Sequence, residues 1–475
     1  MSALGFSFKV KNIELFKRSV RLRLPFRFGV VTLTECPQAF VSVEIENVAG
    51  KTWWGQSAEM MAPKWFDKNL SLSNEDNFNQ LTDVLKSART FYLSDSSPTT
   101  AFGHFARHYQ AHQIHSQMSG FNPLLAAYGP AQIDKAIADA VCRANGLSFY
   151  EAVNKNTLGI DLSSNTLAPD MVDFDWSTFL RTLCPASSVA VRHTIGMVDP
   201  IVQSDISDPI NDGLPQSLDQ VIQKYGVTHF KIKISGDTEH DRDRLRRIAK
   251  IILNQNGSCF VSLDGNEQFD DMAQFSQWLS MMRSDKELIS LFRVIGFIEQ
   301  PVRRDQALIS SITEIPLDWP VIIDESDGEL DSFIKAKALG YCGVSSKACK
   351  GLYKSIINKA RCQLWNSSLS TNRFFMTGED LTTQAGLGVQ QDLALVSLLG
   401  ISHVERNGHH YVNGMAAIPR DEQMRFLESH PDLYEDSHGA VRVSIRDGRL
   451  QLGSLTCSAF STLCEPDFNS MMQIT

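Results

Sequence analysis

The chain has 475 residues, of which 43% are hydrophobic and 21% charged, a composition typical of a globular protein. Its length predicts two domains, and its net charge of −9 argues against nucleic acid as the main partner. No run of about 18 apolar residues predicts a membrane span, the N-terminus lacks a signal-peptide pattern, and the nine cysteines include no CxxC pair, so we expect a cytoplasmic protein with reduced thiols.

Two segments near the N-terminus alternate apolar and polar residues with a period of two. Residues 13–28 and 39–46 are therefore predicted to be strands of a meander. The segment between them, 28–37, is bounded by glycine and proline and is predicted to be a loop. A third strand is expected around Trp53 and Trp54, which we interpret as packing residues because tryptophan is buried on average.

The hydrophobic period changes after residue 74. Residues 74–93 and 130–153 carry apolar side chains at helical spacing and are predicted to be helices. The polar stretch 163–188 contains prolines and is predicted to connect two domains. We therefore predict an N-terminal α+β domain over residues 1–187.

From residue 188 onwards, short apolar runs alternate with helical patterns. The eight runs are residues 189–196, 229–234, 260–266, 295–301, 321–326, 342–347, 373–380 and 401–405. Eight strands that alternate with helices predict a parallel α/β barrel rather than an open sheet, here over residues 188–415. The remaining segment, 416–475, contains one more alternating piece and is expected to pack back against the N-terminal domain.

Ionisable residues stand at the ends of five consecutive runs. They are Lys231, Lys233, Asp264, Glu299, Asp324 and Lys347. The carboxyl ends of barrel strands meet on one face, where such barrels carry their chemistry, so we expect these side chains to converge.

Three of the strand-end residues, Asp264, Glu299 and Asp324, are carboxylates on successive strands. Oxygen ligands of this kind suit Mg²⁺, which keeps positions open for water or substrate. The alternative is three separate salt-bridged acids. The spacing favours a magnesium site.

The lysines are predicted to act on a substrate bound at that metal. Lys231 and Lys233 are two residues apart in a strand and point to the same side, so each lowers the other's pKa, as does a nearby metal. A lowered pKa suits a general base. Lys347 is expected across the barrel, where it can return a proton to the opposite face or hold an oxyanion. Lys350 is predicted to be a loop cation.

The constellation resembles the enolase superfamily, over most of the chain. The matching motifs are Lys231-Ile-Lys233, Asp264-Gly-Asn266, Ile298-Glu-Gln-Pro301, Asp324-Glu-Ser326, Lys347-Ala-Cys-Lys-Gly351, Met376-Thr-Gly-Glu-Asp380 and, near the N-terminus, Trp54-Gly-Gln-Ser-Ala-Glu59. A lysine after the sixth strand resembles the muconate lactonizing enzyme subgroup. Mandelate racemase proper would have an aspartate there. The interval between Asp264 and Glu299 is longer than the family's usual unit, which predicts an insertion.

The resemblance implies a modified (β/α)7β TIM barrel with an α+β capping domain formed by the N-terminal region and the C-terminal tail. It implies Mg²⁺ on the three carboxylates, Lys233 as general base or acid, and Lys347 as its partner on the other face. Lys231 would tune Lys233. Which of Asp324 and Glu325 binds the metal rests on the family pattern alone.

Further substrate contacts are predicted from positions near the strand ends. They are Asn266, Glu325, Glu379, which would orient groups near the substrate, and His193 at the end of the first strand. His409 and His410 follow the eighth strand and are candidates for a place at the site mouth, although histidines in a loop are more often solvated or structural.

The function that the resemblance implies is removal of the α-proton of a small-molecule carboxylate through a metal-stabilised enediolate. The leading hypothesis is a racemase, an epimerase or a cycloisomerase. The alternatives are a dehydratase resembling o-succinylbenzoate synthase and an inactive barrel that serves as a binding protein. The resemblance also implies a homo-oligomer, a dimer or an octamer.

Overall fold

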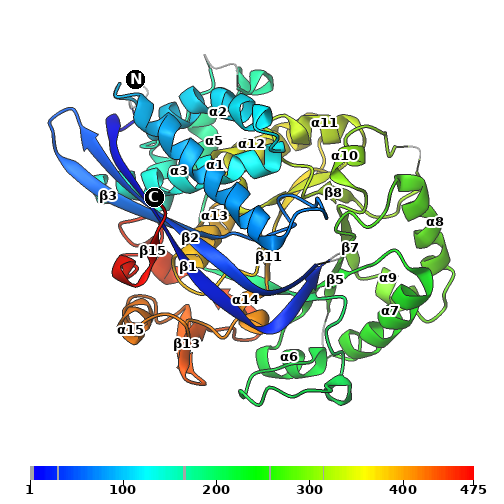
Figure 1. Ribbon diagram of the computed structural model, residues 1–475. Helices are drawn as coiled ribbons and strands as arrows, with labels where there is room; N and C mark the ends of the chain where they lie inside the picture. The colour runs from blue at the N-terminus through cyan, green and yellow to red at the C-terminus, as the bar shows by residue number, and fades with distance from the viewer. Residues whose placement is uncertain (1–4, 29–30, 164–166, 256–257, 314) are drawn as a thin grey trace.

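The computed structural model describes residues 5–28, 31–163, 167–255, 258–313 and 315–475. It contains a parallel barrel and, above the barrel mouth, a cap made of an antiparallel sheet and the helices packed on it (Figure 1). Across the described residues, no helix is both long and apolar enough to cross a membrane.

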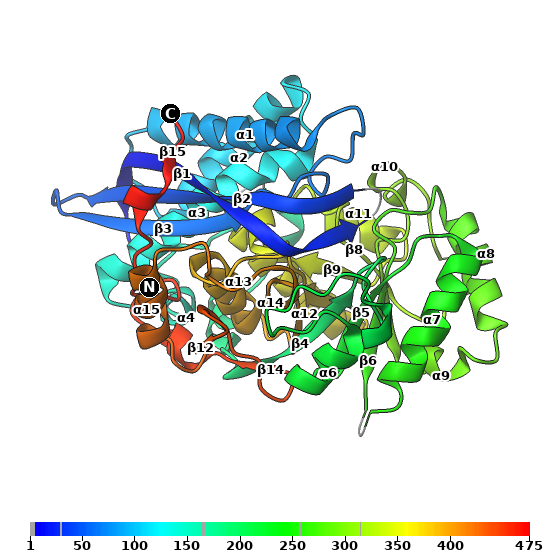
Figure 2. The same cartoon turned by 60° about the horizontal axis from the view of Figure 1, so that its bottom comes forward.

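The sheet of the cap has the strand order β15-β1-β2-β3. Its strands are β1 (Phe8–Phe28), β2 (Val31–Asn47), β3 (Thr52–Met60) and β15 (Met472–Gln473). Strands β1 and β2 form a long hairpin that runs between helices α1 (Asn74–Ser94) and α2 (Ala101–Met118) above it and the barrel below it (Figure 2). At its far end, Leu22 bridges to Val412 and the Phe26 ring lies 4.4 Å from that of Tyr411, so the hairpin contacts the barrel.

The loop prediction over 28–37 is wrong for most of its length, because β2 begins at Val31; Gly29 lies outside the described residues. Pro37 is part of the strand and pairs with Ser19. The pairing of β3 with β2 stops at Gln38, so Pro37 lies at the end of that ladder. Its carbonyl oxygen accepts a 2.8 Å hydrogen bond from Met61 N, and its missing N–H costs no ladder hydrogen bond.

The helices of the cap are α1 (Asn74–Ser94), α2 (Ala101–Met118), α3 (Pro123–Asn145) and α4 (Phe149–Asn154), followed by α5 (Trp176–Thr182). The sequence pattern did not predict α2, because histidines take many of the buried positions that apolar residues would normally fill. Helix α3 begins earlier than predicted and continues through Pro130; Asn122 caps it by accepting a hydrogen bond from Leu125 N.

The barrel strands are β4 (Ser188–Ile195), β5 (His229–Lys233), β6 (Phe260–Asp264), β7 (Ile295–Glu299), β8 (Val321–Ile323), β9 (Gly343–Ser346), β10 (Phe375–Gly378) and β11 (His403–Arg406). They pair in parallel in chain order, and β11 pairs with β4 to close the barrel. The prediction of a parallel barrel beneath an α+β cap is confirmed.

The barrel helices are α6 (Leu218–Tyr225), α7 (Thr238–Ile252), α8 (Met272–Arg283), α9 (Ile289–Phe292), α10 (Arg304–Ala307), α11 (Ser332–Ala338), α12 (Leu352–Leu369) and α13 (Leu387–Leu398). The long interval between Asp264 and Glu299 holds two helices, α8 and the short α9.

The C-terminal tail contains α14 (Gly408–Tyr411), α15 (Arg420–Ser429), β12 (Tyr434–Ser437), β13 (Ala440–Val443) and β14 (Arg449–Gln451). It contacts both parts of the molecule: β14 pairs with β4 of the barrel, and β15 pairs with β1 of the cap. Arg18 of the cap also donates two hydrogen bonds, of 3.1 and 2.8 Å, to the Glu422 carboxylate of α15.

Candidate active site

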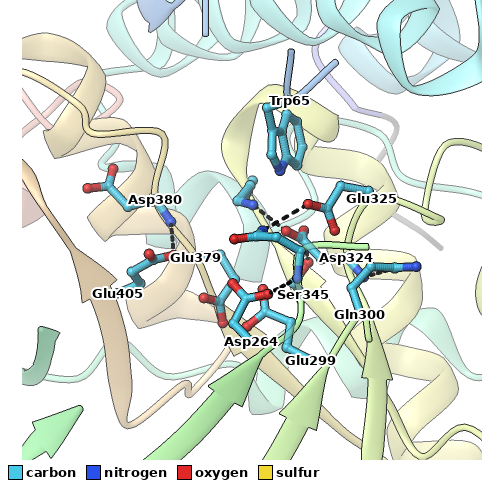
Figure 3. Close-up of polar contacts among 12 residues, drawn as sticks. Trp65, Asp264, Glu299, Gln300, Asp324, Glu325, Ser345, Glu379, Asp380 and Glu405 are labelled. Carbon is cyan, nitrogen blue, oxygen red and sulfur yellow. Dashed lines mark hydrogen bonds and ion pairs between the residues drawn. The ribbon is translucent and has the colours of Figure 1, made fainter. Parts of the chain in front are cut away.

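A cavity lies where the cap meets the carboxyl ends of the barrel strands. The barrel contributes ionisable side chains to its wall, and the cap contributes apolar and aromatic ones. The main ionisable side chains from the barrel are Lys231, Lys233, Asp324, Lys347 and Glu405. The apolar and aromatic side chains from the cap are Phe26, Leu33, Ala62 and Trp65. Figure 3 shows Trp65 standing above Asp324 and Glu325, with Asp264 and Glu299 beneath them.

The strand register brings the predicted site residues to one level. Lys233 of β5 pairs with Asp264 of β6, and Asp264 pairs with Glu299 of β7. In parallel strands, residues in register point to the same face, so these side chains lie next to one another. Asp324 follows directly after β8, the next strand.

Lys231 lies at the centre of the charged cluster. Its Nζ is 2.9 Å from both Asp264 Oδ2 and Glu299 Oε1, 2.7 Å from Glu379 Oε2 and 3.0 Å from Glu405 Oε2. Burial opposes the ammonium charge, but the four carboxylates more than offset it and hold the pKa of Lys231 well above its usual value. The expectation of a lowered pKa is wrong for Lys231, because acids rather than the second lysine dominate its surroundings.

Lys233 has a simpler environment than Lys231. Its Nζ is 2.6 Å from Asp264 Oδ2, and the side chain lines the cavity. Lys231 therefore fixes the acids from below, while Lys233 faces the space that a substrate would fill.

Lys347 lines the same cavity from β9, four strands from β5 in the eight-stranded barrel. Its Nζ is 2.5 Å from Asp324 Oδ2 and 4.1 Å from the ring centroid of Trp65. Burial opposes its charge, but Asp324 more than offsets this and raises the pKa of Lys347. Lys347 is therefore held in its ammonium form on the side of the barrel opposite Lys233.

The prediction that Lys350 is a loop cation is wrong. It ends a short 3₁₀ turn, is only 3% exposed, and places Nζ 2.9 Å from Asp324 Oδ1 and 2.7 Å from Ser345 Oγ. The turn folds the side chain back under the strand ends, where it holds Asp324 in place.

The carboxylates fit a divalent cation by their chemistry. Glu299 Oε2 is buried and has no hydrogen-bond donor among the described residues, and burial together with Asp264 and Glu379 raises the pKa of Glu299 well above its usual value. Three oxygen ligands on adjacent strands are what Mg²⁺ prefers. As the described side chains stand, however, no three acids, histidines or cysteines form a group that could hold a metal, and the lysine ammonium groups pair with the acids instead.

Asn266 and Glu325 form a second layer beside the acids. Asn266 Nδ2 donates a hydrogen bond of 3.1 Å to Glu325 Oε1, and Asn266 N donates one of 2.8 Å to Asp264 Oδ1. Burial, together with the charges of Asp324 and Glu267, raises the pKa of Glu325 to about 7. Asn266 lines the cavity with its backbone in the left-handed region at φ 40°.

Glu379 and Arg192 form the floor below Lys231. Glu379 accepts hydrogen bonds from Lys231 and Arg192, and both Glu379 and Arg192 are fully or almost fully buried. Glu379 therefore orients Lys231 from below rather than facing the cavity directly.

Sequence reasoning missed several residues of this site, among them Glu405 and Trp65. Glu405 is the penultimate residue of β11 and binds Lys231; it ends the predicted run 401–405, so the strand-end signal that identified the other acids would have identified it. Trp65 comes from an irregular segment of the cap, where no periodicity or spacing marks it.

His193 does not reach the cavity, so its prediction as a substrate contact is wrong. Its neighbours in β4, Arg192 and Thr194, bond to Glu379 and Glu405 inside the barrel, and alternation directs His193 to the opposite face. There its Nδ1 lies 3.2 Å from His409 Nε2. The ring of His193 is also 5.2 Å from that of His410, so the three histidines pack together outside the barrel.

Comparison with known proteins gives one family match. Residues 214–455, just over half of the chain, match the family model described as enolase C-terminal domain-like. No curated protein matches the sequence.

Solved structures resemble the whole chain at low sequence identity. The dipeptide epimerase of Enterococcus faecalis V583, complexed with Mg and the dipeptide L-Leu-L-Tyr, has a TM-score of 0.59 and 16% identity, covering 95% of this chain and 99% of its own. The muconate lactonizing enzyme of Pseudomonas fluorescens has a TM-score of 0.59 and 15% identity, covering 97% and 98%. A Bradyrhizobium enolase complexed with magnesium and mandelic acid has a TM-score of 0.59 and 12% identity, covering 94% and 93%.

Proposed function

The chain belongs to the enolase superfamily, and on that basis we propose that it is a Mg²⁺-dependent racemase or epimerase of an α-substituted carboxylate. The observation that carries this proposal is that Lys233 and Lys347 line one cavity from strands on opposite sides of the barrel. A racemase needs this arrangement, because one base removes the α-proton and a second delivers a proton to the other face.

Asp264, Glu299 and Asp324 would hold the metal in this proposal. Bound Mg²⁺ supplies positive charge that makes the proton next to a substrate carboxylate more acidic. The lysines that now pair with Asp264 and Asp324 would then be released toward the substrate. Glu299 Oε2 accepts no hydrogen bond from the described residues, and this is the feature of the chain that supports a metal-binding role for the three carboxylates.

Lys233, as the neutral amine, would take the α-proton: the C–H bond breaks, its electron pair stays on the substrate, and the lone pair of Nζ forms an N–H bond. Lys347 would give a proton from its ammonium group to the opposite face of the same carbon. Lys231 would keep its positive charge throughout, because the four surrounding carboxylates stabilise it, and would hold the acids in register.

Proton NMR in D2O with Mg²⁺ tests this function. The protein is incubated with pooled dipeptides, N-acyl amino acids, sugar acids and muconate-like lactones. We expect metal-dependent loss of one α-proton signal and growth of the other stereoisomer. The Lys233→Ala and Lys347→Ala variants should each lose isomerisation, while each keeps exchange of one enantiomer.

Other outcomes would replace the proposal. A dehydratase would depend on Lys233 far more than on Lys347 and would release water without stereoisomer formation. A cycloisomerase would form or open a lactone. A protein that neither binds Mg²⁺ nor exchanges any α-proton would be a binding protein rather than an enzyme.

A further inference from the structure

Trp65 presents an unused hydrogen-bond donor to the cavity. The residue is 5% exposed, and its Nε1 has no acceptor among the described residues. In Figure 3 the ring nitrogen lies on the edge that faces the acidic cluster. A buried indole N–H usually has a partner, so an unpartnered one beside a cavity indicates a ligand acceptor.

The position of the indole places that acceptor next to the reacting carbon. The Trp65 ring centroid is 4.1 Å from Lys347 Nζ, so the ring covers the lysine that would deliver the proton. A substrate group in contact with Trp65 would therefore lie close to the α-carbon.

Two asparagines in the same cavity wall have side-chain oxygens that could accept a hydrogen bond from a substrate N–H. The Nδ2 groups of Asn266 and Asn407 donate to the carboxylates of Glu325 and Glu405, at 3.1 and 2.9 Å. A carboxylate accepts hydrogen bonds, so this orientation leaves the amide oxygen of each asparagine for another donor. Both oxygens are buried without a partner among the described residues.

The rest of the wall accommodates no further charge. Every charged side chain among the described residues that line the cavity already has an oppositely charged partner: Lys231, Lys233, Asp324, Lys347, Asp380 and Glu405. The remaining surface includes Leu33, Ala62 and Leu381, which are apolar. Lys233 and Lys347, which metal binding would release, flank the reacting carbon, so a second charge elsewhere on the substrate would be buried without a partner, which is costly.

We propose that Trp65 is a specificity-determining residue that selects α-carboxylates carrying a neutral secondary amide on the α-carbon. Its N–H donates to the amide carbonyl, Asn266 or Asn407 accepts from the amide N–H, and the acyl group and side chain of the substrate lie on the apolar wall. This inference rests on the proposed function, whose substrate class it narrows.

Arg304 is the positioning residue for Trp65. Its Nη1 and Nη2 donate to the carbonyl oxygens of Phe66 and Trp65, at 2.9 and 2.8 Å. Its Nε and Nη2 also donate to both oxygens of Glu267, at 2.9 and 2.8 Å. Lys68 of the cap lies 3.0 Å from the same carboxylate, so the cap segment is fastened to the barrel at Trp65 and just after it.

A matched pair of ligands tests the proposal without requiring turnover. N-acetyl-L-leucine and 4-methylpentanoate share a carbon skeleton and a carboxylate and differ in the amide. With Mg²⁺ present, calorimetric titration of the wild type should show about tenfold tighter binding of N-acetyl-L-leucine, a preference that two neutral hydrogen bonds can supply. N-succinyl-L-leucine, which adds a charge, should bind more weakly than N-acetyl-L-leucine.

The Trp65→Phe variant keeps an aromatic ring over Lys347 and removes only the N–H. It should reduce the preference for the amide to about threefold or less, with little change for 4-methylpentanoate. Trp54→Phe is the matched control, because Trp54 is 38% exposed on β3 and does not line the cavity. The proposal is overturned if the wild type shows no preference for the amide, if it does not bind N-acetyl-L-leucine, or if Trp65→Phe leaves the preference unchanged.

Arg304→Lys tests the positioning role. It should lower the amide preference as Trp65→Phe does, and the double variant should lose no more than Trp65→Phe alone, because both act through one hydrogen bond. Arg303→Lys is the control: Arg303 is the exposed neighbour of Arg304 and pairs with Asp305, so its substitution should not change the amide preference. Independent, additive losses would contradict the positioning role. α-Proton exchange without amide preference would refute this inference alone, and amide preference without exchange would refute the proposed function alone.

Discussion

The barrel mouth and the helices of the cap both bury ionisable groups, but they stabilise them in opposite ways. At the mouth, lysines and carboxylates lie in oppositely charged pairs at distances of 2.5–3.0 Å. In the cap, the buried histidines of α2 and Asp134 of α3 have no charged partner at such distances among the described residues. Burial therefore shifts each of them toward its neutral form.

The cap groups are held by neutral contacts. His104 lies 3.1 Å from the carbonyl oxygen of Phe8, and the ring of His108 is 4.9 Å from that of Tyr92. The Tyr92 hydroxyl donates a 2.7 Å hydrogen bond to Asp134, and burial raises the pKa of that carboxyl to about 8. These residues fill space between helices as polar core.

The difference indicates where the protein does chemistry. Keeping many charges in a buried site costs desolvation free energy that apolar packing would avoid, so a paired charged cluster beside a cavity indicates function more than stability. Buried neutral histidines and acids carry no such indication. Four experiments test whether the two regions differ in this way.

Removal of the proposed base should have the largest effect. Lys233→Ala should lower the rate of α-proton exchange in D2O by about two to four orders of magnitude, the usual contribution of a general base. The control in the cap is His108→Phe, which should leave the rate within about twofold of wild type. An equal loss in both variants would mean that the loss reflects stability and not catalysis.

Asp324→Asn should destabilise the protein by about 3–5 kcal/mol at pH 7.5, because Lys347 and Lys350 would be buried without their carboxylate partner. Urea denaturation with a chelator present measures the free energy of unfolding. Asp318→Asn breaks an exposed pair with Arg283 and should cost about 1 kcal/mol or less. A small effect at Asp324 would show that the mouth charges are not mutually stabilised.

An aspartate-to-asparagine substitution in the cap, Asp134→Asn, should raise the free energy of unfolding rather than lower it. The folded pKa of Asp134 is about 8 and its unfolded value 3.8, so between these pH values the folded state alone holds the proton and stability falls as pH rises. Asp134→Asn cannot titrate and should stabilise the protein by about 1–3 kcal/mol at pH 8, with little gain at pH 4. Loss of stability at both pH values would contradict a neutral Asp134.

The buried histidines of α2 should lower the stability of the protein below pH 6.5, by less than the changes expected above. Burial lowers the pKa of His104 and of His112 from 6.5 to about 4, so their stabilisation is complete above pH 6.5 and is lost as the pH falls toward 4. His112→Leu should reduce the acid loss between pH 7 and pH 5 by about 1–2 kcal/mol. Exposed His240→Leu should not alter it. An unchanged pH profile in His112→Leu would mean that this histidine is not buried neutral.

Strand-end residues were the most predictable part of this molecule. Each barrel strand is a short apolar run that can be recognised locally, and parallel strands necessarily bring their carboxyl ends to one face. Lys233, Asp264, Glu299, Asp324 and Lys347 therefore meet as expected. Their metal-binding and catalytic roles stay predictions until the experiments above are done.

Features that depend on side-chain direction or on distant partners were not predictable in this way. His193 was placed in the site because it ends a strand, but a single step of alternation directs it outside the barrel. Lys350 was assigned to a solvated loop, and a 3₁₀ turn buries it. Helix α2 has no apolar periodicity because histidines occupy its buried face.

The sequence by itself determined the order of the barrel strands, the closed barrel and most of the acids and lysines at its mouth, since these follow from local periodicity and from the geometry of parallel strands. Only the tertiary structure decided which groups pair and what covers them. Lys231 meets Glu405, and Trp65 meets Lys347, across more than 150 residues of chain. Such contacts depend on how the cap and the tail pack on the barrel, and no local pattern records that packing.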